Sequence, residues 1–257
     1  MSMQVTNVSF AYGTRRVLND ISFSARDGEL LSVLGANGVG KSTLFRCMLG
    51  LNRRCTGEIR VDDMRIDTLS PRILAKHMAY IPQSHSNTFN YSVFDIVLMG
   101  ASTQVAFSGN PGAREREIVM EALEKLDIAD FASRDFTRLS GGEQQLVLIA
   151  RALAQQSKTL IMDEPTANLD FGNQERVLRR IRLLAEEGYA IILSTHHPEQ
   201  AYRFSHAILA MHDGHIIAHG SPEEVMTAEL MQKLYGLPVQ VESLYDDSVR
   251  VCVPITH

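Results

Sequence analysis

The sequence predicts an α/β fold in which buried strands alternate with helices and a helical segment interrupts the alternation. Short apolar runs at 30–34, 159–162 and 190–194 have the length and composition of strands that are buried on both faces. From about residue 84 to residue 155, apolar residues instead recur with the period of a helix. The pattern therefore indicates an α/β core with an inserted helical subdomain.

The other strands are expected nearer the two ends of the chain. Alternating apolar residues at 4–10 and 21–25 predict two strands, with Asn19-Asp20 as a turn between them. A further strand is expected at 57–61. Near the end, Asp213-Gly214 is typical of a hairpin turn between strands at 206–211 and 215–218. The tail from residue 228 to 257 offers a short helix and two strands.

Helices are predicted where apolar residues line one face. The clearest helix follows the first buried strand and should end at Gly50, because glycine readily adopts the left-handed conformation that closes a helix. The expected helices cover residues 41–49, 93–100, 113–126, 143–154 and 173–187.

Composition disfavours several classes of protein. The net charge of −5 disfavours a nucleic-acid binder, which usually presents a basic face. The three cysteines match neither a disulfide framework nor a zinc site. No secretory signal is visible, and no apolar run approaches the ~18 residues that a membrane-spanning helix needs. A role at a membrane would therefore require a separate membrane partner.

The stretch GANGVGKS at 35–42 fits the phosphate-binding pattern G-x-x-x-x-G-K-[ST]. The glycines let the backbone curl so that successive N–H groups point at phosphate oxygens, and the positive end of the following helix adds to the attraction. Lys41 should reach the β- and γ-phosphates, and the Ser42 hydroxyl is placed to ligate Mg²⁺. A glycine-rich turn with a chance lysine is disfavoured by the strand before it and the helix after it.

Two acidic residues follow the buried strand at 159–162. Ligands of open α/β sheets bind at the carboxyl ends of strands, so Asp163 suits a Mg²⁺ site. Glu164 lies past the strand end and could turn toward the γ-phosphate to polarise an attacking water. An apolar run that ends in Asp-Glu is weak evidence for a site when it stands alone, because many strands end in this way at a solvated edge. It is strong evidence here only because the phosphate-binding loop precedes it.

A second glycine motif, Leu139-Ser140-Gly141-Gly142-Glu143, precedes a helix. Ser140 and Glu143 form a capping box. Each of the two glycines in the first helical turn lowers the stability of the helix by roughly 1 kcal/mol. Their presence is explained if they let a ligand approach the helix N-terminus closely. Two anion sites and one nucleotide indicate a dimer in which each subunit completes the other's pocket; a plain capped helix would explain the same residues without a ligand.

In order and spacing, these motifs resemble those of the ATP-binding cassette (ABC) ATPases over about residues 3–235. Residues 35–43 resemble the Walker A motif, 139–143 the signature motif and 168–170 the D-loop. The resemblance implies a P-loop NTPase core of the RecA-like type, with an antiparallel β subdomain and an inserted α-helical subdomain at about 84–155. It divides the chain into an ATPase domain at 1–235 and a C-terminal extension at 236–257.

The resemblance also assigns roles to single residues. Tyr12 would stack on adenine, Gln83 would contact Mg²⁺ or the attacking water and sense the membrane partner, and His196 would hold the γ-phosphate. The implied ATP-binding residues are Tyr12, Gly35, Asn37, Gly38, Gly40, Lys41, Ser42, Thr43, Ser140, Gly141 and Gly142. The implied Mg²⁺ ligands are Ser42, Gln83 and Asp163, and the implied catalytic residues are Lys41, Gln83, Glu164 and His196.

Three further segments, at 95–100, 152–155 and 234–239, resemble the importers of metal chelates. That group takes up iron–siderophore, haem, cobalamin and, in some members, oxyanions such as molybdate. The resemblance therefore implies an ATPase homodimer on the cytoplasmic face of the inner membrane, bound to an integral membrane permease in two copies. A periplasmic or extracellular solute-binding protein would act indirectly, and no nucleic acid is expected.

The aromatic residues Phe89, Tyr91 and Phe94 lie close to Gln83 in the sequence. They are either ordinary packing of the helical insertion or, as the resemblance implies, a groove for a short permease helix. The same motifs would also suit an ABC ATPase without a permease, for example of the iron–sulfur assembly type, a nucleotide sensor without turnover, or an exporter. The residues do not name the transported solute.

Overall fold

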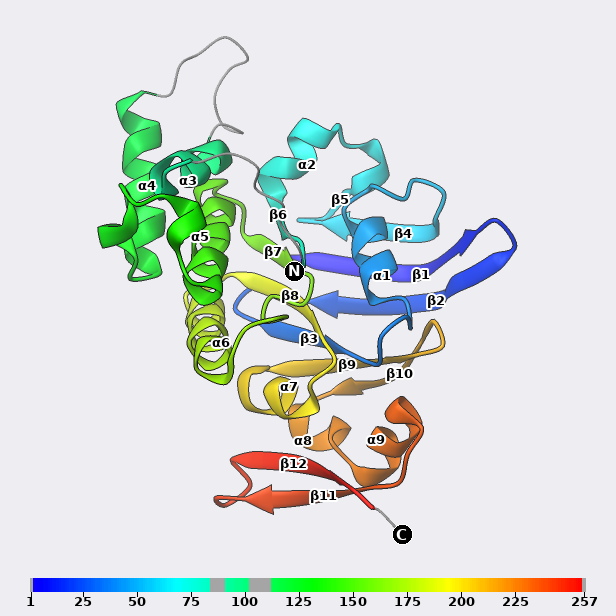
Figure 1. The fold of residues 1–257 in the computed structure, drawn as a ribbon. Coiled ribbons are helices and arrows are strands. Elements are labelled where there is room, and N and C mark those ends of the chain that lie inside the picture. The colour runs from blue at the N-terminus through cyan, green and yellow to red at the C-terminus, as the bar shows by residue number, and fades with distance from the viewer. Residues whose placement is uncertain (1, 84–90, 102–111, 256–257) are drawn as a thin grey trace.

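The computed structural model describes residues 2–83, 91–101 and 112–255, so part of the helical segment, including Phe89, lies outside the described residues. Figure 1 shows two sheets stacked around a helix, a group of helices at one side and a small hairpin at the end of the chain. The predicted α/β fold with antiparallel β and helical parts is confirmed.

The larger sheet has six strands in the order β10-β9-β3-β8-β7-β6. All neighbours pair in parallel except β10, which returns antiparallel beside β9 through the predicted Asp213-Gly214 turn. The strands are β3 (Leu30–Leu34), β6 (Met78–Ile81), β7 (Thr159–Met162), β8 (Ala190–Thr195), β9 (Ala207–His212) and β10 (His215–Gly220). The central strands are fully buried, as their continuous apolar sequence predicts.

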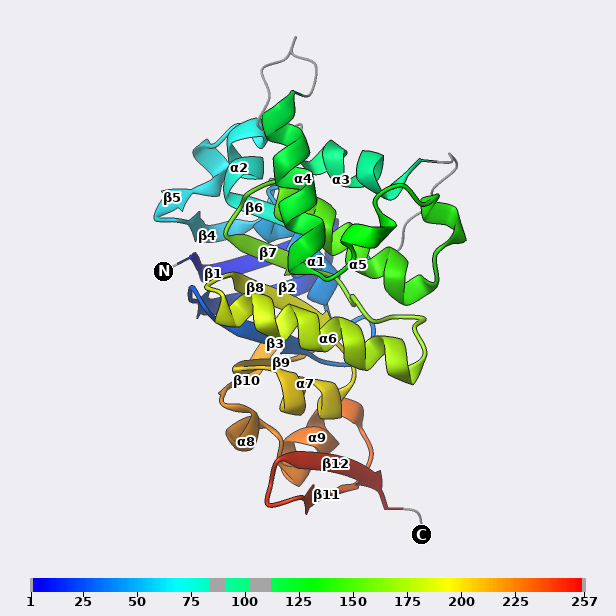
Figure 2. The same cartoon turned by 90° about the vertical axis from the view of Figure 1, so that its left-hand side faces the viewer.

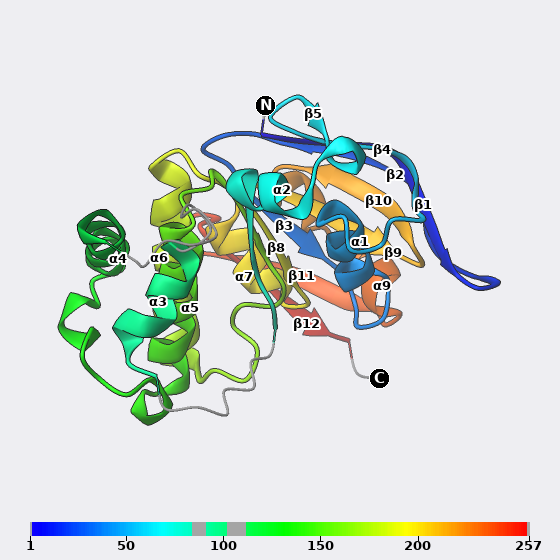
Figure 3. The same ribbon diagram turned by 90° about the horizontal axis from the view of Figure 1, so that it is seen from above.

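The two faces of this sheet bury different helices because successive side chains of a strand point in opposite directions. Leu31 and Val33 pack in one cluster with α1 (Lys41–Met48) and the smaller sheet. Leu30 packs in the other cluster with α5 (Gly141–Ala154) and α6 (Phe171–Glu186). Figure 3 accordingly shows α1 and α5 on different sides of the central strands.

The smaller sheet is antiparallel, with strand order β2-β1-β4-β5. Its strands are β1 (Met3–Tyr12), β2 (Arg15–Ala25), β4 (Thr56–Val61) and β5 (Met64–Arg65). The predicted turn at Asn19-Asp20 is wrong, because β2 runs through both residues and the chain turns at Gly13 instead. The pairing of β1 with β2 shifts beside Asp20, whose φ is 52°. This is a β-bulge, and aspartate tolerates its left-handed backbone as it would that of a turn.

The helical segment packs α3 (Val93–Ala101) and α4 (Ala113–Lys125) against α5, at one edge of the molecule (Figure 2). Short 3₁₀ turns at Ala129–Phe131 and Phe136–Arg138 connect α4 to α5. A further 3₁₀ turn at Ile66–Thr68 and helix α2 (Pro71–His77) lead into β6; the sequence pattern predicted neither α2 nor β6. Among the described residues, no helix is long and apolar enough to cross a membrane.

The end of the chain forms α7 (Pro198–Phe204), α8 (Pro222–Val225), α9 (Ala228–Tyr235) and a separate hairpin of β11 (Val239–Leu244) with β12 (Val249–Pro254). The short helix and two strands predicted for the tail are thus present. Buried Met231 and Leu234 of α9 share a cluster with Leu34, the last residue of β3. The tail therefore shares a buried cluster with the strand that leads into the glycine-rich loop.

Candidate functional site

The glycine-rich loop joins β3 to α1 in a conformation that depends on its glycines. Gly40 is the residue before the helix and has a φ of 113°, which other residues rarely adopt. A Cβ at Gly35 would lie 2.5 Å from the carbonyl oxygen of Met211 in β9. The loop is thus held close to the neighbouring strand, with the N-terminus of α1 open in front of it.

Lys41 begins α1 and folds back along the loop. Its Nζ donates hydrogen bonds to the carbonyl oxygens of Gly35 at 2.8 Å and Ala36 at 3.1 Å. The side chain is only 5% exposed, and Nζ lies 3.5 Å from the Glu164 Oε1 atom. Burial lowers the pKa of Lys41, while the Glu164 carboxylate opposes this by favouring the charged ammonium.

An open pocket of about 370 Å³ lies against the N-terminus of α1. It is lined by Val17, Asn37, Gly38, Gly40, Lys41, Ser42, Thr43, Gln83 and Glu164. Most of these residues belong to the predicted ATP site, although Val17 of β2 was not predicted. The structure thus gathers residues from both sheets and from the start of the helical segment around one space.

One serine from the neighbouring strand contacts both of the acidic residues that follow β7. The Ser194 hydroxyl, in β8, donates to Asp163 Oδ1 at 2.6 Å and accepts from the Glu164 backbone N–H at 2.9 Å. Glu164 itself has a φ of 46°, in the left-handed region. Ser194 therefore fixes the peptide at which the two acidic side chains diverge, a role that sequence reasoning missed because the contact spans about 30 residues.

Glu164 is the point at which the remaining predicted catalytic side chains meet. The Gln83 Nε2 atom donates to Glu164 Oε2 at 3.2 Å, and His196 Nδ1 lies 3.3 Å from the same oxygen. The Glu164 side chain is 12% exposed and that of His196 is 34% exposed. A carboxylate in this position, reached by an amide, an imidazole and an ammonium, is suited to accept a proton from a water in the pocket.

The pocket fits a nucleoside triphosphate. Among the described residues, nothing lies within 4 Å of the position that a Cβ at Gly38 would take, and the φ of 84° at this residue turns the backbone toward the open space. The curled backbone, the start of α1 and Lys41 supply the donors that phosphate oxygens require. For Mg²⁺, Ser42, Gln83 and Asp163 offer oxygen ligands, the type that this ion prefers.

Tyr12 lies at the margin of this site rather than among the residues that line it. Its ring is 47% exposed and packs edge-on against Phe10 at 4.8 Å between centroids. Asn52 Nδ2 donates to its hydroxyl at 3.4 Å, and this contact lowers the pKa of Tyr12. An exposed aromatic face beside α1 is available for stacking on a base.

The second glycine motif forms the first turn of α5, as the capping box predicts. Ser140 accepts from the Glu143 N–H, and the Glu143 carboxylate accepts from the Ser140 N–H at 2.8 Å. Packing explains one of its glycines, because a Cβ at Gly142 would lie 2.3 Å from Asn173 Oδ1 of α6. Within the described residues, Ser140, Gly141 and Gly142 do not line the pocket at α1 of their own chain.

The arrangement of loop, acidic pair and second glycine motif is that of a known family. The sequence model of a family described as ABC transporter matches residues 18–167. The chain belongs to the ABC transporter family. Because the relatives of this chain are ATP-binding subunits of ABC transporters, the predicted ATP-binding and ATPase functions are confirmed.

Relatives of this ABC ATPase cover nearly its whole length. The hemin import ATP-binding protein HmuV of Rhodococcus jostii is 35% identical over 242 residues, 94% of this chain and 82% of its own. The molybdate import ATP-binding protein MolC of Haemophilus influenzae is 34% identical over 250 residues, 96% of this chain and 93% of its own.

Two similar solved structures show ABC proteins in larger assemblies. One is an inward-facing conformation of an ABC transporter assigned to the metal-chelate type, with a TM-score of 0.87, 33% identity and coverage of 99% and 97% of the two chains. The other is a dimeric ATP-binding cassette with bound ADP and phosphate, with a TM-score of 0.72, 26% identity and coverage of 86% and 98%. This chain is accordingly the ATPase of an ABC importer, a class that dimerises and works with a membrane permease.

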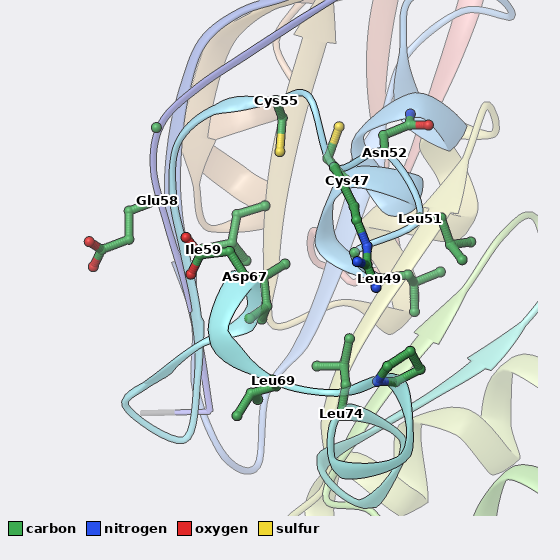
Figure 4. Close-up of a pocket in the computed structure, with 15 residues that line it drawn as sticks. Cys47, Leu49, Leu51, Asn52, Cys55, Glu58, Ile59, Asp67, Leu69 and Leu74 are labelled. Atoms are coloured by element: carbon green, nitrogen blue, oxygen red, sulfur yellow. The ribbon is translucent and has the colours of Figure 1, made fainter.

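A larger cavity of about 480 Å³ lies away from the ATP site, at the other end of α1 (Figure 4). Cys47 and Cys55 both line it and hydrogen bond to each other. This hydrogen bond lowers the pKa of Cys55 to about 7 and raises the pKa of buried Cys47. The glycine-rich loop and Glu164, however, meet at the smaller pocket and not at this cavity.

Proposed function

We propose that this ATPase binds Mg-ATP along residues 35–43 and uses Glu164 to activate the attacking water. The observation that carries the proposal is the convergence on one carboxylate. Lys41, Gln83 and His196 all reach Glu164, at 3.5, 3.2 and 3.3 Å. Glu164 would take the proton of the water, while Lys41 and His196 would stabilise charge that develops on the γ-phosphate.

Mg²⁺, held by Ser42, Asp163 and Gln83, would neutralise charge on the β- and γ-phosphates. The chain's own part is to keep the three ligands in place. Ser194 does this for Asp163 through the 2.6 Å hydrogen bond to Oδ1. Tyr12 would cover the adenine. These roles extend the family assignment to particular residues, and each can be tested separately.

The complete site would contain two chains. Ser140, Gly141 and Gly142 sit at the N-terminus of α5, where backbone N–H groups and the helix dipole attract anions. Because they do not line their own chain's pocket within the described residues, we place them on the ATP of a second copy. ATP would then join the two subunits head to tail, and loss of the γ-phosphate would release them.

The cargo proposed for this chain is a metal chelate or a metal oxyanion. The similar ATPases are named for hemin and for molybdate import, which supports this class without selecting one member. Two copies of a permease would carry the solute through the membrane, and a solute-binding protein would deliver it from outside. The ATPase would lie on the cytoplasmic face, with residues 1–235 as its catalytic domain and 236–257 as an extension.

Replacement of Glu164 by glutamine tests the catalytic assignment. The amide keeps the shape and one of the two acceptor oxygens but cannot accept the proton, so hydrolysis should fall by about 10²- to 10⁴-fold while ATP binding persists. Single-turnover hydrolysis and gel filtration with Mg-ATP should show slow turnover and an accumulated dimer. Turnover near that of the unmodified protein would refute the role of Glu164.

Affinity purification of the tagged chain from native membranes in mild detergent tests the partner. A polytopic permease in equal stoichiometry is expected, and reconstitution of that complex would allow hemin, cobalamin and molybdate uptake to be compared. Recovery of soluble partners alone would instead support an ABC ATPase that works without a permease.

Tyr91→Asp and Phe94→Asp should lower permease recovery without unfolding the chain, if these residues form the docking groove.

A further inference from the structure

The residues just after β8 form a short loop, His196 and His197, that ends at Pro198, the first residue of α7. The His197 N–H donates to Thr195 Oγ1 at 3.1 Å, which ties this side of the loop to the strand. The carbonyl oxygen of His196 accepts a hydrogen bond from the tail of the chain. The backbone of His196, which is predicted to hold the γ-phosphate, is thus tied to the tail of the chain as well as to β8.

The partner of that carbonyl is Tyr235, the last residue of α9. Its hydroxyl donates to the His196 carbonyl oxygen at 3.0 Å, across 39 residues of sequence. Burial raises the pKa of Tyr235 well above its usual range, so the hydroxyl keeps its proton and stays a donor. On the other side of the same residue, His196 Nδ1 faces Glu164 Oε2 at 3.3 Å.

Tyr235 is itself firmly placed. The adjacent Leu234 and the Met231 side chain are 2% and 0% exposed and belong to the same buried cluster as Leu34, the residue before the glycine-rich loop. Gly236 closes α9 in the left-handed conformation with a φ of 72°. A partly buried tyrosine on a helix whose apolar face is packed in this way can hold a loop with little freedom of its own.

We propose that Tyr235 is a positioning residue for ATP hydrolysis, which fixes the His196 peptide so that the imidazole stays beside Glu164. This inference rests on the proposed role of His196. It gives the tail a function in the chemical step: the last helix of the domain sets the geometry of a residue that acts on the γ-phosphate. Tyr235 would not touch ATP.

Tyr235→Phe removes the hydroxyl and keeps the ring. Because one neutral hydrogen bond is worth about 1 kcal/mol, kcat should fall by about threefold to tenfold, with KM for ATP nearly unchanged and a urea unfolding midpoint no lower than that of the control variant. The matched control is Tyr202→Phe, which removes a hydroxyl that donates to the Asp247 carbonyl at 2.6 Å, away from the His196 carbonyl. That variant should keep its kcat.

A double-mutant cycle distinguishes an effect on the position of His196 from a general destabilisation of the fold. The rates are measured by single-turnover hydrolysis with the full chain in excess over ATP. In a His196→Ala background, Tyr235→Phe should have no further effect on the rate, because its effect passes through the imidazole. An unchanged kcat in Tyr235→Phe, or an equal fall in both backgrounds, would overturn the proposal while leaving the role of His196 intact. A normal rate for His196→Ala alone would overturn both.

Discussion

Glu164 combines a strained backbone with a central position in the site. Its φ of 46° costs a non-glycine residue of order 1 kcal/mol or more, and such strain persists only where surrounding contacts impose it. Here the Ser194 hydroxyl holds the Glu164 N–H at 2.9 Å while Lys41 holds the carboxylate at 3.5 Å. The Glu164 carboxylate accepts from Gln83 and the Asp163 carboxylate accepts from Ser194, so the two adjacent carboxylates have different partners.

Ser194→Ala should therefore damage both carboxylates at once. It leaves the buried Asp163 without its 2.6 Å donor and the Glu164 N–H without an acceptor, which should lower the free energy of unfolding by about 1–3 kcal/mol. The ATPase rate should fall as well. Ser205→Ala is the control, because Ser205 donates to Ser32 at 2.6 Å in a similarly buried pair away from the acidic residues.

In urea titrations both serine variants should lose stability, whereas only Ser194→Ala should lose activity. If Ser205→Ala lowered the rate to the same extent, the loss would reflect general destabilisation, and the specific role of Ser194 would be wrong.

The three thiols should react at very different rates. The hydrogen bond from Cys47 sets the pKa of Cys55 at about 7, whereas burial raises the pKa of Cys252 to about 11. Since the thiolate is the reactive form, iodoacetamide should label Cys55 first, with a rate that rises between about pH 6 and pH 8. Peptide mass mapping over time measures this, with Cys252 as the internal control.

Cys47→Ala should shift the labelling of Cys55 to higher pH, because the thiolate loses its hydrogen-bond donor. A labelling profile of Cys55 that did not move in this variant would show that the pair is not coupled.

At the scale of elements, the first turns of α5 and α6 determine how the signature motif is presented. Asp170 caps α6 by accepting from the Asn173 N–H at 2.9 Å and holds the Asn173 side chain at 2.8 Å. That side chain occupies the space in which a Cβ of Gly142 would lie. The glycine thus lets two helix starts approach each other, in addition to its proposed contact with ATP.

Gly142→Ala and Gly141→Ala should differ in stability. At Gly142 the new methyl would meet Asn173 at 2.3 Å, so overpacking should lower the free energy of unfolding by about 1–3 kcal/mol. At Gly141 the nearest atom is a Leu169 methyl at 3.1 Å, which can move aside. Urea unfolding distinguishes the two, and equal stability of both variants would contradict the role of Asn173.

Local patterns predicted those elements whose signals lie close together in the sequence. The loop at 35–42, the capping box of Ser140 and Glu143, and the hairpin at Asp213-Gly214 each depend on a few neighbouring residues. Helix α5 begins two residues before its predicted start, because the glycines themselves take the first helical positions. The four-residue strand β6 was not predicted, because so short an apolar run shows no periodicity that separates it from the preceding helix.

Long-range contacts were invisible in the sequence. Ser194 lies about 30 residues from the acidic pair and Tyr235 lies 39 residues from His196, so no periodicity or spacing links them. The hydrogen bonds appear only once the strands are placed side by side. The place of Val17 in the pocket could not be predicted for the same reason, since β2 reaches the loop from the other sheet.

In the whole molecule, the two proposed anion sites belong to helices on different sides of the central sheet. The pocket lies at the start of α1, while the signature motif starts α5 (Figure 3). In the proposed assembly one chain would therefore offer two half-sites, and a symmetric pair of chains would offer two complete ones.

Mixing two inactive variants tests this arrangement. Lys41→Ala removes one half-site and Ser140→Arg the other, so each homodimer should be inactive. Mixed dimers contain one intact site, and an equimolar mixture should recover up to about a quarter of the unmodified ATPase rate. An ATPase assay of the mixture against the separate variants measures this. A mixture no more active than its components would contradict a site shared between chains.

The position of β3 in its sheet also constrains how the chain can be built. The antiparallel sheet is complete once residue 65 has been made, whereas β3 lies between β8 and β9, whose residues extend to 212. During synthesis, the strand that carries the glycine-rich loop must therefore wait until residues 190–195 have been made before its first neighbour exists. Such non-local parallel pairing is slow and leaves apolar strands exposed. A nascent chain that ends before residue 190 should accordingly be unable to retain ATP, and an interrupted synthesis yields a product prone to aggregation rather than a weaker enzyme.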